Sequence, residues 1–364
     1  MKLPLPWTLP ASSKAAAGDD AGPETLPARV VPVLWLLGKT GAGKSSLVRA
    51  LTNLPEAEVG DGFVSCTKTA RAFSFPADRP LVEFLDTRGL GETGYDPAED
   101  IAECDGRANA VLAVARLDDP VQGALIDVLR EVRRRRPRLS VILVLTGADQ
   151  IPDAAQRTRV AAETTAKVRA AVGPDLICAE AAVPPDGLVQ IDALVEALAR
   201  VLPSVALLLN PGTARGEEAR RFAEVKPRVL AFATMAGSSD LAPLIGAVSV
   251  PSTQAAMLAW LARSYGVEWS ARMAASFIGT LGGGIAARYA ALFGLRQVGK
   301  MIPVLGQTAV AAASGTVSFA STFAIGRAAA FYFHHQSRGN TVADADLRKV
   351  YADALRGGLK GSDG

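Results

Sequence analysis

The segment Gly38–Ser45, which reads GKTGAGKS, restricts the fold of this chain more than any other feature. It matches the pattern GxxxxGK[ST] in full, and it lies between the apolar run Val30–Leu37 and a helix-compatible run that starts near Lys44. The pattern needs a strand that ends in a glycine-rich turn, followed directly by a helix, so that backbone N–H groups surround a phosphate. The sequence therefore predicts a phosphate-binding loop within an α/β domain.

Short apolar runs alternate with helical stretches on both sides of this loop, and such runs are typical of buried strands in a parallel sheet. The alternation predicts a three-layer α/β domain, a mostly parallel sheet with helices on both faces. The expected strands lie within Val30–Leu37, Leu81–Leu85, Ala110–Ala115, Val141–Leu145 and Asp175–Val183. The expected helices are Lys44–Leu54, Pro97–Cys104, Pro120–Arg136, Asp153–Val172 and Leu188–Leu208.

The residues of the phosphate-binding loop have separate expected roles. The glycines Gly38, Gly41 and Gly43 let the backbone curl so that successive N–H groups point at phosphate oxygens. Lys44 is expected to bind the β and γ phosphates, and Ser45 to ligate Mg²⁺. The residues expected to contact the nucleotide in this region are Gly38, Lys39, Thr40, Gly41, Ala42, Gly43, Lys44, Ser45 and Ser46.

A second motif, Asp86–Gly89, follows the apolar residues Val82–Leu85 and matches the DxxG element of GTPases. Asp86 would belong to the Mg²⁺ shell, and the backbone N–H of Gly89 would contact the γ-phosphate. A lone DxxG is common, but its position after the phosphate-binding loop makes it informative.

A third motif, Thr146–Asp149, ends the apolar run Val141–Leu145 and resembles the [NT]KxD guanine-recognition motif. Asp149 can accept hydrogen bonds from the guanine N1–H and 2-amino groups, which adenine does not offer. A wrong base would leave the carboxylate unpaired, so Thr146 and Asp149 are expected to select guanine. Gly147 stands where the motif usually has a lysine whose stem packs over the base, and this change affects affinity more than base identity.

With these three motifs in this order, residues 28–205 resemble an Era-like P-loop GTPase of the translation-factor-related class. The resemblance implies binding of GTP and GDP with Mg²⁺, and hydrolysis of GTP. It also implies a switch threonine that ligates Mg²⁺, and within Ser65–Thr69 we favour Thr67 over Thr69. The expected catalytic residues are then Lys44 and Thr67, and the expected metal ligands are Ser45, Thr67 and Asp86.

Leu90 follows the second motif, at the position where Ras-like enzymes have a glutamine that positions water. A leucine side chain cannot orient water, so we expect slow intrinsic hydrolysis. The missing group would come from a partner, a second copy of the chain, a cation or another switch residue, with Arg88 and Glu92 as nearby candidates.

The chain is 364 residues long, which favours more than one domain. Asn210–Gly212 would break the last helix of the α/β domain, and the charged stretch Arg215–Lys226 follows as a linker or bridging helix. The expected parts are a disordered leader at 1–28, a G domain at 29–209, a linker at 210–225, an apolar and mainly α-helical domain at 226–335, and a short amphipathic helix with a flexible tail at 336–364.

The expected helical domain contains the long charge-free runs Leu241–Ala262 and Met301–Gly326, and both exceed the roughly 20 residues that span a bilayer. These runs are rich in alanine and glycine and are interrupted by prolines, so a soluble helical bundle is the alternative. Ile302–Gly306 and Gly326–Phe333 resemble a bacterial domain of unknown function that follows GTPase domains and occurs in small inner-membrane proteins. We therefore expect the protein at the cytoplasmic face of the inner membrane, or in the cytoplasm if the helical domain is soluble.

The overall charge balance, a formal net charge of +3, does not indicate a nucleic-acid partner, and none is expected. The main functional hypothesis is a slow Mg²⁺-dependent GTPase that acts as a nucleotide switch coupled to a membrane-associated helical domain, with a second copy of the chain or an activating protein as candidate partners. A GTP-dependent dimerisation or assembly module with a soluble effector domain is the alternative. An ATP-dependent kinase or transporter subunit would share the phosphate-binding loop but would not need Asp149.

Overall fold

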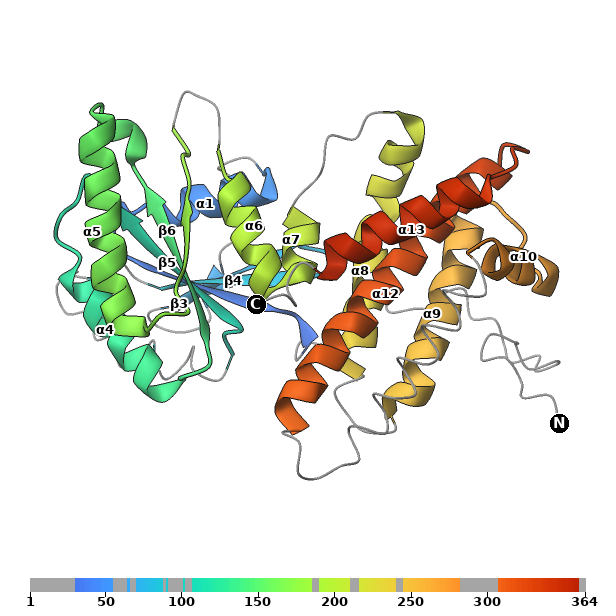
Figure 1. Ribbon diagram of the computed structural model, residues 1–364, viewed down its shortest axis with the longest axis horizontal. Coiled ribbons are helices and arrows are strands. Elements are labelled where there is room, and N and C mark those ends of the chain that lie inside the picture. The colour runs from blue at the N-terminus through green and yellow to red at the C-terminus, as the bar shows by residue number, and fades with distance from the viewer. Residues whose placement is uncertain are drawn as a thin grey trace. The chain divides into compact units, whose positions relative to one another are not determined.

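The computed structural model describes residues 30–54, 64–65, 70–87, 90, 101, 107–184, 190–209, 216–239, 245–281 and 307–359. These residues divide into an α/β unit, Val31–Asn210, and a helical unit that contains Pro211–Gly364 (Figure 1). The predicted fold class, an α/β G domain followed by a mainly α-helical region, is confirmed.

The sheet of the α/β unit has seven strands among the described residues, in the order β2-β3-β4-β1-β5-β6-β7. The strands from β4 to β7 in this order run parallel, whereas β3 is antiparallel to β4, and β2 to β3. The strands are β1 (Val33–Gly38), β2 (Val64–Ser65), β3 (Ala70–Phe75), β4 (Val82–Thr87), β5 (Ala110–Arg116), β6 (Ser140–Thr146) and β7 (Ile177–Glu180).

The five parallel strands lie within or next to the apolar runs that predicted them, but β2 and β3 were not predicted. In β3 only Phe73 and Phe75 are large apolar residues, and they alternate with polar Ser74, so this strand lacks the continuous apolar run of a central strand. Its pairing with β4 over the whole length, from Ala70–Thr87 to Phe75–Val82, places it in the sheet.

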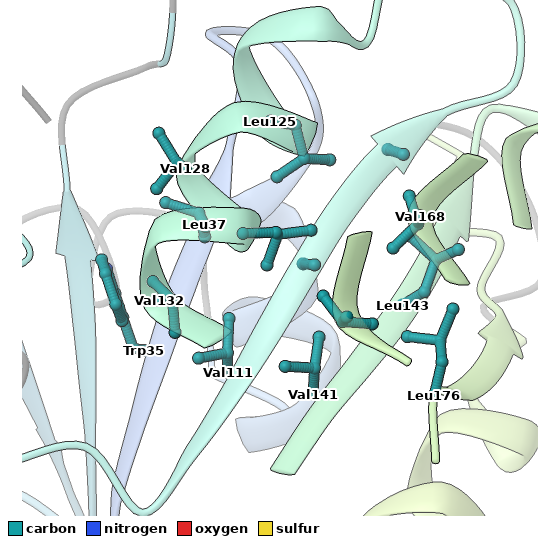
Figure 2. Close-up of a cluster of buried hydrophobic side chains, with 14 of the residues drawn as sticks. Trp35, Leu37, Val111, Leu125, Val128, Val132, Val141, Leu143, Val168 and Leu176 are labelled. Atoms are coloured by element: carbon teal, nitrogen blue, oxygen red, sulfur yellow. The ribbon is translucent and has the colours of Figure 1, made fainter. Parts of the chain in front are cut away.

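Both faces of the sheet are buried, because side chains alternate between the two faces along each strand. In β1, Trp35 and Leu37 belong to one apolar cluster, and Leu34 and Leu36 belong to the other. The first cluster is shown in Figure 2, where Leu125, Val128 and Val132 of one helix and Val168 of another cover the strands.

Helices therefore cover both faces, which gives the three layers that the sequence predicts. On the face of Trp35 lie α4 (Gly123–Arg135) and α5 (Ala154–Val172), and on the face of Leu34 lie α1 (Lys44–Thr52), α6 (Asp192–Val201) and α7 (Pro203–Leu209) (Figure 1).

One helix prediction differs from the structure, and another lies mostly outside the described residues. The expected helix Leu188–Leu208 is divided at Leu202 into α6 and α7, because Pro203 has no N–H to continue the ladder and is instead the first residue of α7. Apart from Ile101, the expected helix Pro97–Cys104 lies outside the described residues.

The helical unit is built around one long helix, α12 (Gln307–Gln336), which packs against three others: α8 (Glu217–Ser239), α9 (Ile245–Ser264) and α13 (Asp344–Leu359) (Figure 1). The helix α10 (Ala271–Leu281) contacts α13. Most of the charged stretch Arg215–Lys226 lies in the first turns of α8, where Glu218 forms a two-point ion pair with Arg327 of α12. Arg327 also covers the ring of Phe222, with 4.5 Å between guanidinium carbon and ring centroid.

Glycines bring α12 close to its neighbours. A Cβ atom on Gly237 of α8 would lie 2.9 Å from the carbonyl oxygen of Gly315 in α12. A Cβ atom on Gly358 of α13 would lie 2.8 Å from Cβ of Ala320, also in α12. The helix backbones are thus in direct contact at these two crossings.

Nowhere in the described part of the chain does a helix have both the length and the apolar character needed to cross a bilayer. The runs Leu241–Ala262 and Met301–Gly326 each begin in residues outside the described set. Membrane association therefore stays a prediction from the sequence.

The contact at Gly237 predicts a large effect of one methyl group. Gly237→Ala should lower the free energy of unfolding by about 1–3 kcal/mol, because the new Cβ meets a backbone carbonyl that cannot rotate away. Gly279→Ala in α10 is the matched control, since among the described residues no atom beyond the helix's own nearby backbone lies within 4 Å of a Cβ at Gly279, and alanine favours the helix. Urea denaturation followed by circular dichroism measures both variants, and equal stability of the two would contradict the packing described here.

Candidate nucleotide-binding site

The motif residues converge at one edge of the sheet because the parallel strands all end there, the usual position of ligand sites in open α/β sheets. The phosphate-binding loop follows β1, and Asp86 lies near the end of the neighbouring β4. On the other side of β1, Arg116 ends β5 and pairs in register with Thr146, which ends β6. Motifs far apart in the sequence thus lie on adjacent strands.

The phosphate-binding loop, Gly38–Ser45, has the backbone conformation that its glycines predict. Gly41 and Gly43 have φ angles of 77° and 95°, in the left-handed region where residues with a Cβ are strained. Helix α1 begins at Lys44, and Gly43 provides no side-chain cap. The first N–H groups of a helix have no acceptor within the helix, so this end of α1 can donate to an anion.

Thr146 holds the loop in place from the neighbouring strand end. Its buried hydroxyl donates a hydrogen bond of 2.9 Å to the carbonyl oxygen of Ala42, within the loop. A Cβ atom on Gly43 would lie 3.8 Å from the same threonine side chain. Thr146, expected from the sequence to help select the base, therefore makes its described contact with the phosphate-binding loop.

Lys44 is buried, and its amino group faces the inside of the loop. Nζ donates to the carbonyl oxygens of Gly38 at 3.0 Å and Lys39 at 3.4 Å. The same atom lies 3.9 Å from Oδ1 of Asp86. A cation is thus held at the centre of the loop, close to the first carboxylate expected at the metal site.

Asp86 is the residue whose surroundings test the fit of a metal ion. Its Oδ1 atom is buried and accepts no hydrogen bond from the residues that the structure describes. Burial raises the pKa of Asp86, against the opposing effect of Lys44 and Arg71. A buried carboxylate oxygen without a donor is costly, and carboxylate oxygens are the ligands that Mg²⁺ prefers. Asp86 and the exposed hydroxyl-bearing Ser45 in the first turn of α1 therefore fit a Mg²⁺ ion.

The base-recognition motif continues from β6 into the short helix η2 (Ala148–Gln150) through Gly147, whose φ is 69°. Asp149 is exposed, and its Oδ2 atom accepts a hydrogen bond of 2.5 Å from Gln150 Nε2. The carboxylate is accessible, as an acceptor for a base edge must be. An unpaired carboxylate is costly only when it is buried, so strict selection of guanine over adenine requires that the bound base itself shield Asp149 from water.

Two ion pairs next to this motif were not predicted. Arg116 forms a two-point pair with Asp118, with distances of 2.8 Å from Nε to Oδ1 and 2.6 Å from Nη2 to Oδ2. Lys39, expected to contact nucleotide, is bound by Asp119 at 2.5 Å. The hydrogen bonds from Arg116 and Lys39 hold the pKa values of Asp118 and Asp119, respectively, below their usual range. In the sequence, the polar residues directly after the apolar run Ala110–Ala115 could have indicated these ion pairs.

The remaining predicted residues have mixed outcomes. Thr67 and Gly89 lie outside the described residues, as do Arg88 and Glu92. Leu90 is described: its N–H donates to the carbonyl oxygen of Gly38 at 3.3 Å, and the residue is 2% exposed in the same apolar cluster as Trp35. In the loop and the first turn of α1, Thr40 is exposed, Ser46 is half-buried and Ala42 is buried.

Residues 33–146 match the family model described as "50S ribosome-binding GTPase". The match runs from the first residue of β1 to the last residue of β6, so it contains the phosphate-binding loop, Asp86 and Thr146. This segment is therefore similar, in fold, motifs and sequence, to a P-loop GTPase family, a class that binds guanine nucleotides.

Individual relatives resemble only part of the chain. "Uncharacterized protein YfjP" of Escherichia coli (strain K12) is 30% identical over 122 residues, which are 33% of this chain and 42% of that protein. The chain thus covers less than half of this relative's length. The crystal structure of bacterial selenocysteine-specific elongation factor EF-Sec is 18% identical, with a TM-score of 0.30 over 41% of this chain and 25% of that one.

Asp86→Asn tests whether Asp86 serves a metal. Because burial raises the pKa of Asp86, the folded protein binds more protons than the unfolded chain between the ordinary and the raised pKa, so this group's contribution to stability falls as pH rises through that window. Asparagine at this position is uncharged, so at pH 7 it avoids the free-energy cost of burying an ionised carboxylate. We therefore expect the melting temperature of the nucleotide-free variant to stay level or rise.

The same variant should lose the Mg²⁺ dependence of nucleotide binding, with a roughly 10- to 100-fold weaker metal affinity measured by Mg²⁺ titration at fixed GTP analogue. The control is Glu83→Gln, which removes another carboxylate of β4, one paired with Arg107. Equal Mg²⁺ dependence in both variants would remove Asp86 from the metal site.

Proposed function

We propose that this protein binds GTP and GDP with Mg²⁺, hydrolyses GTP slowly, and acts as a nucleotide-controlled switch. The observation that carries the proposal is the buried Oδ1 of Asp86, which accepts no hydrogen bond from the described residues and lies 3.9 Å from Nζ of Lys44. The carboxylate and the lysine are too far apart to form a hydrogen bond with each other, and both lie beside the N-terminus of α1. This arrangement fits binding of a Mg²⁺ ion by the carboxylate and of phosphate by the lysine.

At the phosphate end, the chain supplies donors and a cation. The N–H groups at the start of α1 donate to phosphate oxygens, and Lys44 moves from the loop carbonyls to the β and γ phosphates. Ser45 and Asp86 would hold a Mg²⁺ ion, which would supply positive charge to neutralise the phosphate oxygens.

At the base end, Asp149 accepts hydrogen bonds from the N1–H and 2-amino groups of guanine. Adenine has no donor in these positions, so it would leave a carboxylate unpaired in the bound state. The exposure of Asp149 keeps this acceptor open to an incoming base.

Hydrolysis is expected to be slow because Leu90 belongs to the apolar core and presents no polar group to a water molecule. A partner, a second copy of the chain or another switch residue would supply the missing group.

The backbone of Leu90 gives a route for the switch. Its N–H donates to the carbonyl oxygen of Gly38, and Lys39 and Leu90 form an isolated parallel bridge. Leu90 is therefore joined to the phosphate-binding loop, so a contact with the γ-phosphate would change both together. We propose that this change reaches the helical unit at the cytoplasmic face of the inner membrane or, if that unit does not contact lipid, in the cytoplasm.

The proposal is tested by binding of fluorescent GDP to the full chain with Mg²⁺, in competition with GDP, ADP and xanthosine diphosphate. GDP should compete and ADP should not. Lys44→Ala should weaken GDP binding roughly 10- to 100-fold, because a charged partner of the phosphates is lost. Lys167→Ala, which removes an exposed lysine of α5, should leave binding unchanged.

Asp149→Asn should lower the affinity for GDP and raise the affinity for xanthosine diphosphate, because the asparagine amide can donate a hydrogen bond to the 2-oxo group of xanthine. Equal competition by ADP, or no GDP binding by the unmodified chain, would contradict the guanine assignment. GTP turnover per molecule that rises with protein concentration would instead favour the dimerisation or assembly module.

A further inference from the structure

Arg116 lies between the two ends of the proposed nucleotide site. Its Nη1 atom is 3.5 Å from the carbonyl oxygen of Gly41, in the exposed part of the phosphate-binding loop. The hydrogen bond with Asp118 raises the pKa of Arg116. The nearby negative charges of Asp149 and Asp119 raise it further, by smaller amounts. The guanidinium is therefore near the phosphate end and near the base end at once.

The space beside Gly147 is filled by the ion pair of Arg116 and Asp118. A Cβ atom on Gly147 would lie 2.8 Å from Oδ1 of Asp118 and 3.6 Å from Nε of Arg116. Any longer side chain at this position would displace the pair. The lysine stem that could cover a base at position 147 is thus absent, and the ion pair of Asp118 and Arg116 lies beside this position.

A nucleotide with phosphates in the loop and its base edge at Asp149 must pass across this position. The middle of such a ligand is a sugar and a flat aromatic base. A guanidinium is also flat, and arginine stacks on aromatic faces and on nucleic-acid bases. Asp118 binds both Nε and Nη2, so it fixes the plane of the guanidinium, and the Arg116 side chain stays partly exposed.

We propose that Arg116 is a further nucleotide-binding residue of the site: its guanidinium packs against the ribose and base of the bound guanine nucleotide, beside Gly147. Asp118 is the positioning residue that holds it there. This inference rests on the proposed function, and it adds a contact that none of the three sequence motifs contains.

Two other roles for Arg116 give different results. If Arg116 only supports the phosphate-binding loop through Gly41, its loss weakens every ligand of that loop equally. If the pair with Asp118 is an ordinary surface ion pair, with side chains 37% and 32% exposed, its loss leaves the affinity for every ligand unchanged. Pyrophosphate separates these cases, because it occupies the phosphate end and has no base.

The experiment measures GDP and pyrophosphate affinities of the full chain by competition with fluorescent GDP in Mg²⁺. Arg116→Ala should lower the affinity for GDP about 10-fold, the effect of losing one stacking contact, and should change the affinity for pyrophosphate by less than about twofold. Arg116→Lys, which keeps the charge and a long stem, should regain part of the GDP affinity. The control Arg130→Ala removes an exposed arginine of α4 that is paired with Asp127, and it should bind both ligands normally.

Melting temperatures of the nucleotide-free variants show whether each has folded, and Arg116→Lys supplies the comparison if the alanine variant has not. Equal weakening of GDP and pyrophosphate, or no change in either, would overturn the proposed role of Arg116 while leaving guanine-nucleotide binding intact. Absence of GDP binding by the unmodified chain would overturn the proposed function and this role with it.

Discussion

The hydrogen bond from Thr146 to the carbonyl oxygen of Ala42 joins the two halves of the site. It connects the end of β6, which carries Asp149, to the loop that follows β1. Between these strands lies only β5, and the register of all three is fixed by continuous parallel pairing. The distance between the phosphate end and the base end is therefore set by the sheet, and a ligand that spans both must have the matching length.

The sheet can hold this geometry because both of its faces are buried. Alternate residues of β1 enter separate apolar clusters, so a one-residue shift of the strand would exchange Trp35 and Leu37 with Leu34 and Leu36. The rigid sheet also supports a costly feature: Asp86 keeps a buried carboxylate oxygen that no described residue satisfies. Binding sites often retain such groups at the expense of stability, because the ligand supplies the missing partner.

The sequence predicts the part of the fold that depends on local pattern. The glycines of Gly38–Ser45 and the central apolar runs indicate the loop and the parallel strands, since both signals are short and continuous. Strand β3 was missed because its apolar pattern is weak, and its place in the sheet follows from pairing with β4. The role of Arg116 was also missed, because it follows from the register of β5 beside Gly147 and from no motif of its own. The site residues Thr67 and Gly89 stay predictions.

Hydrogen–deuterium exchange of the full chain with Mg²⁺ and either GDP or ADP tests the central claim most directly, because it locates the ligand on the sequence. The account predicts that GDP slows exchange in two separate segments, the loop Gly38–Ser45 with the start of α1, and Thr146–Asp149, and that ADP does not protect the second. Protection of neither segment by GDP, or equal protection of both by ADP, would contradict a site built for guanine nucleotides.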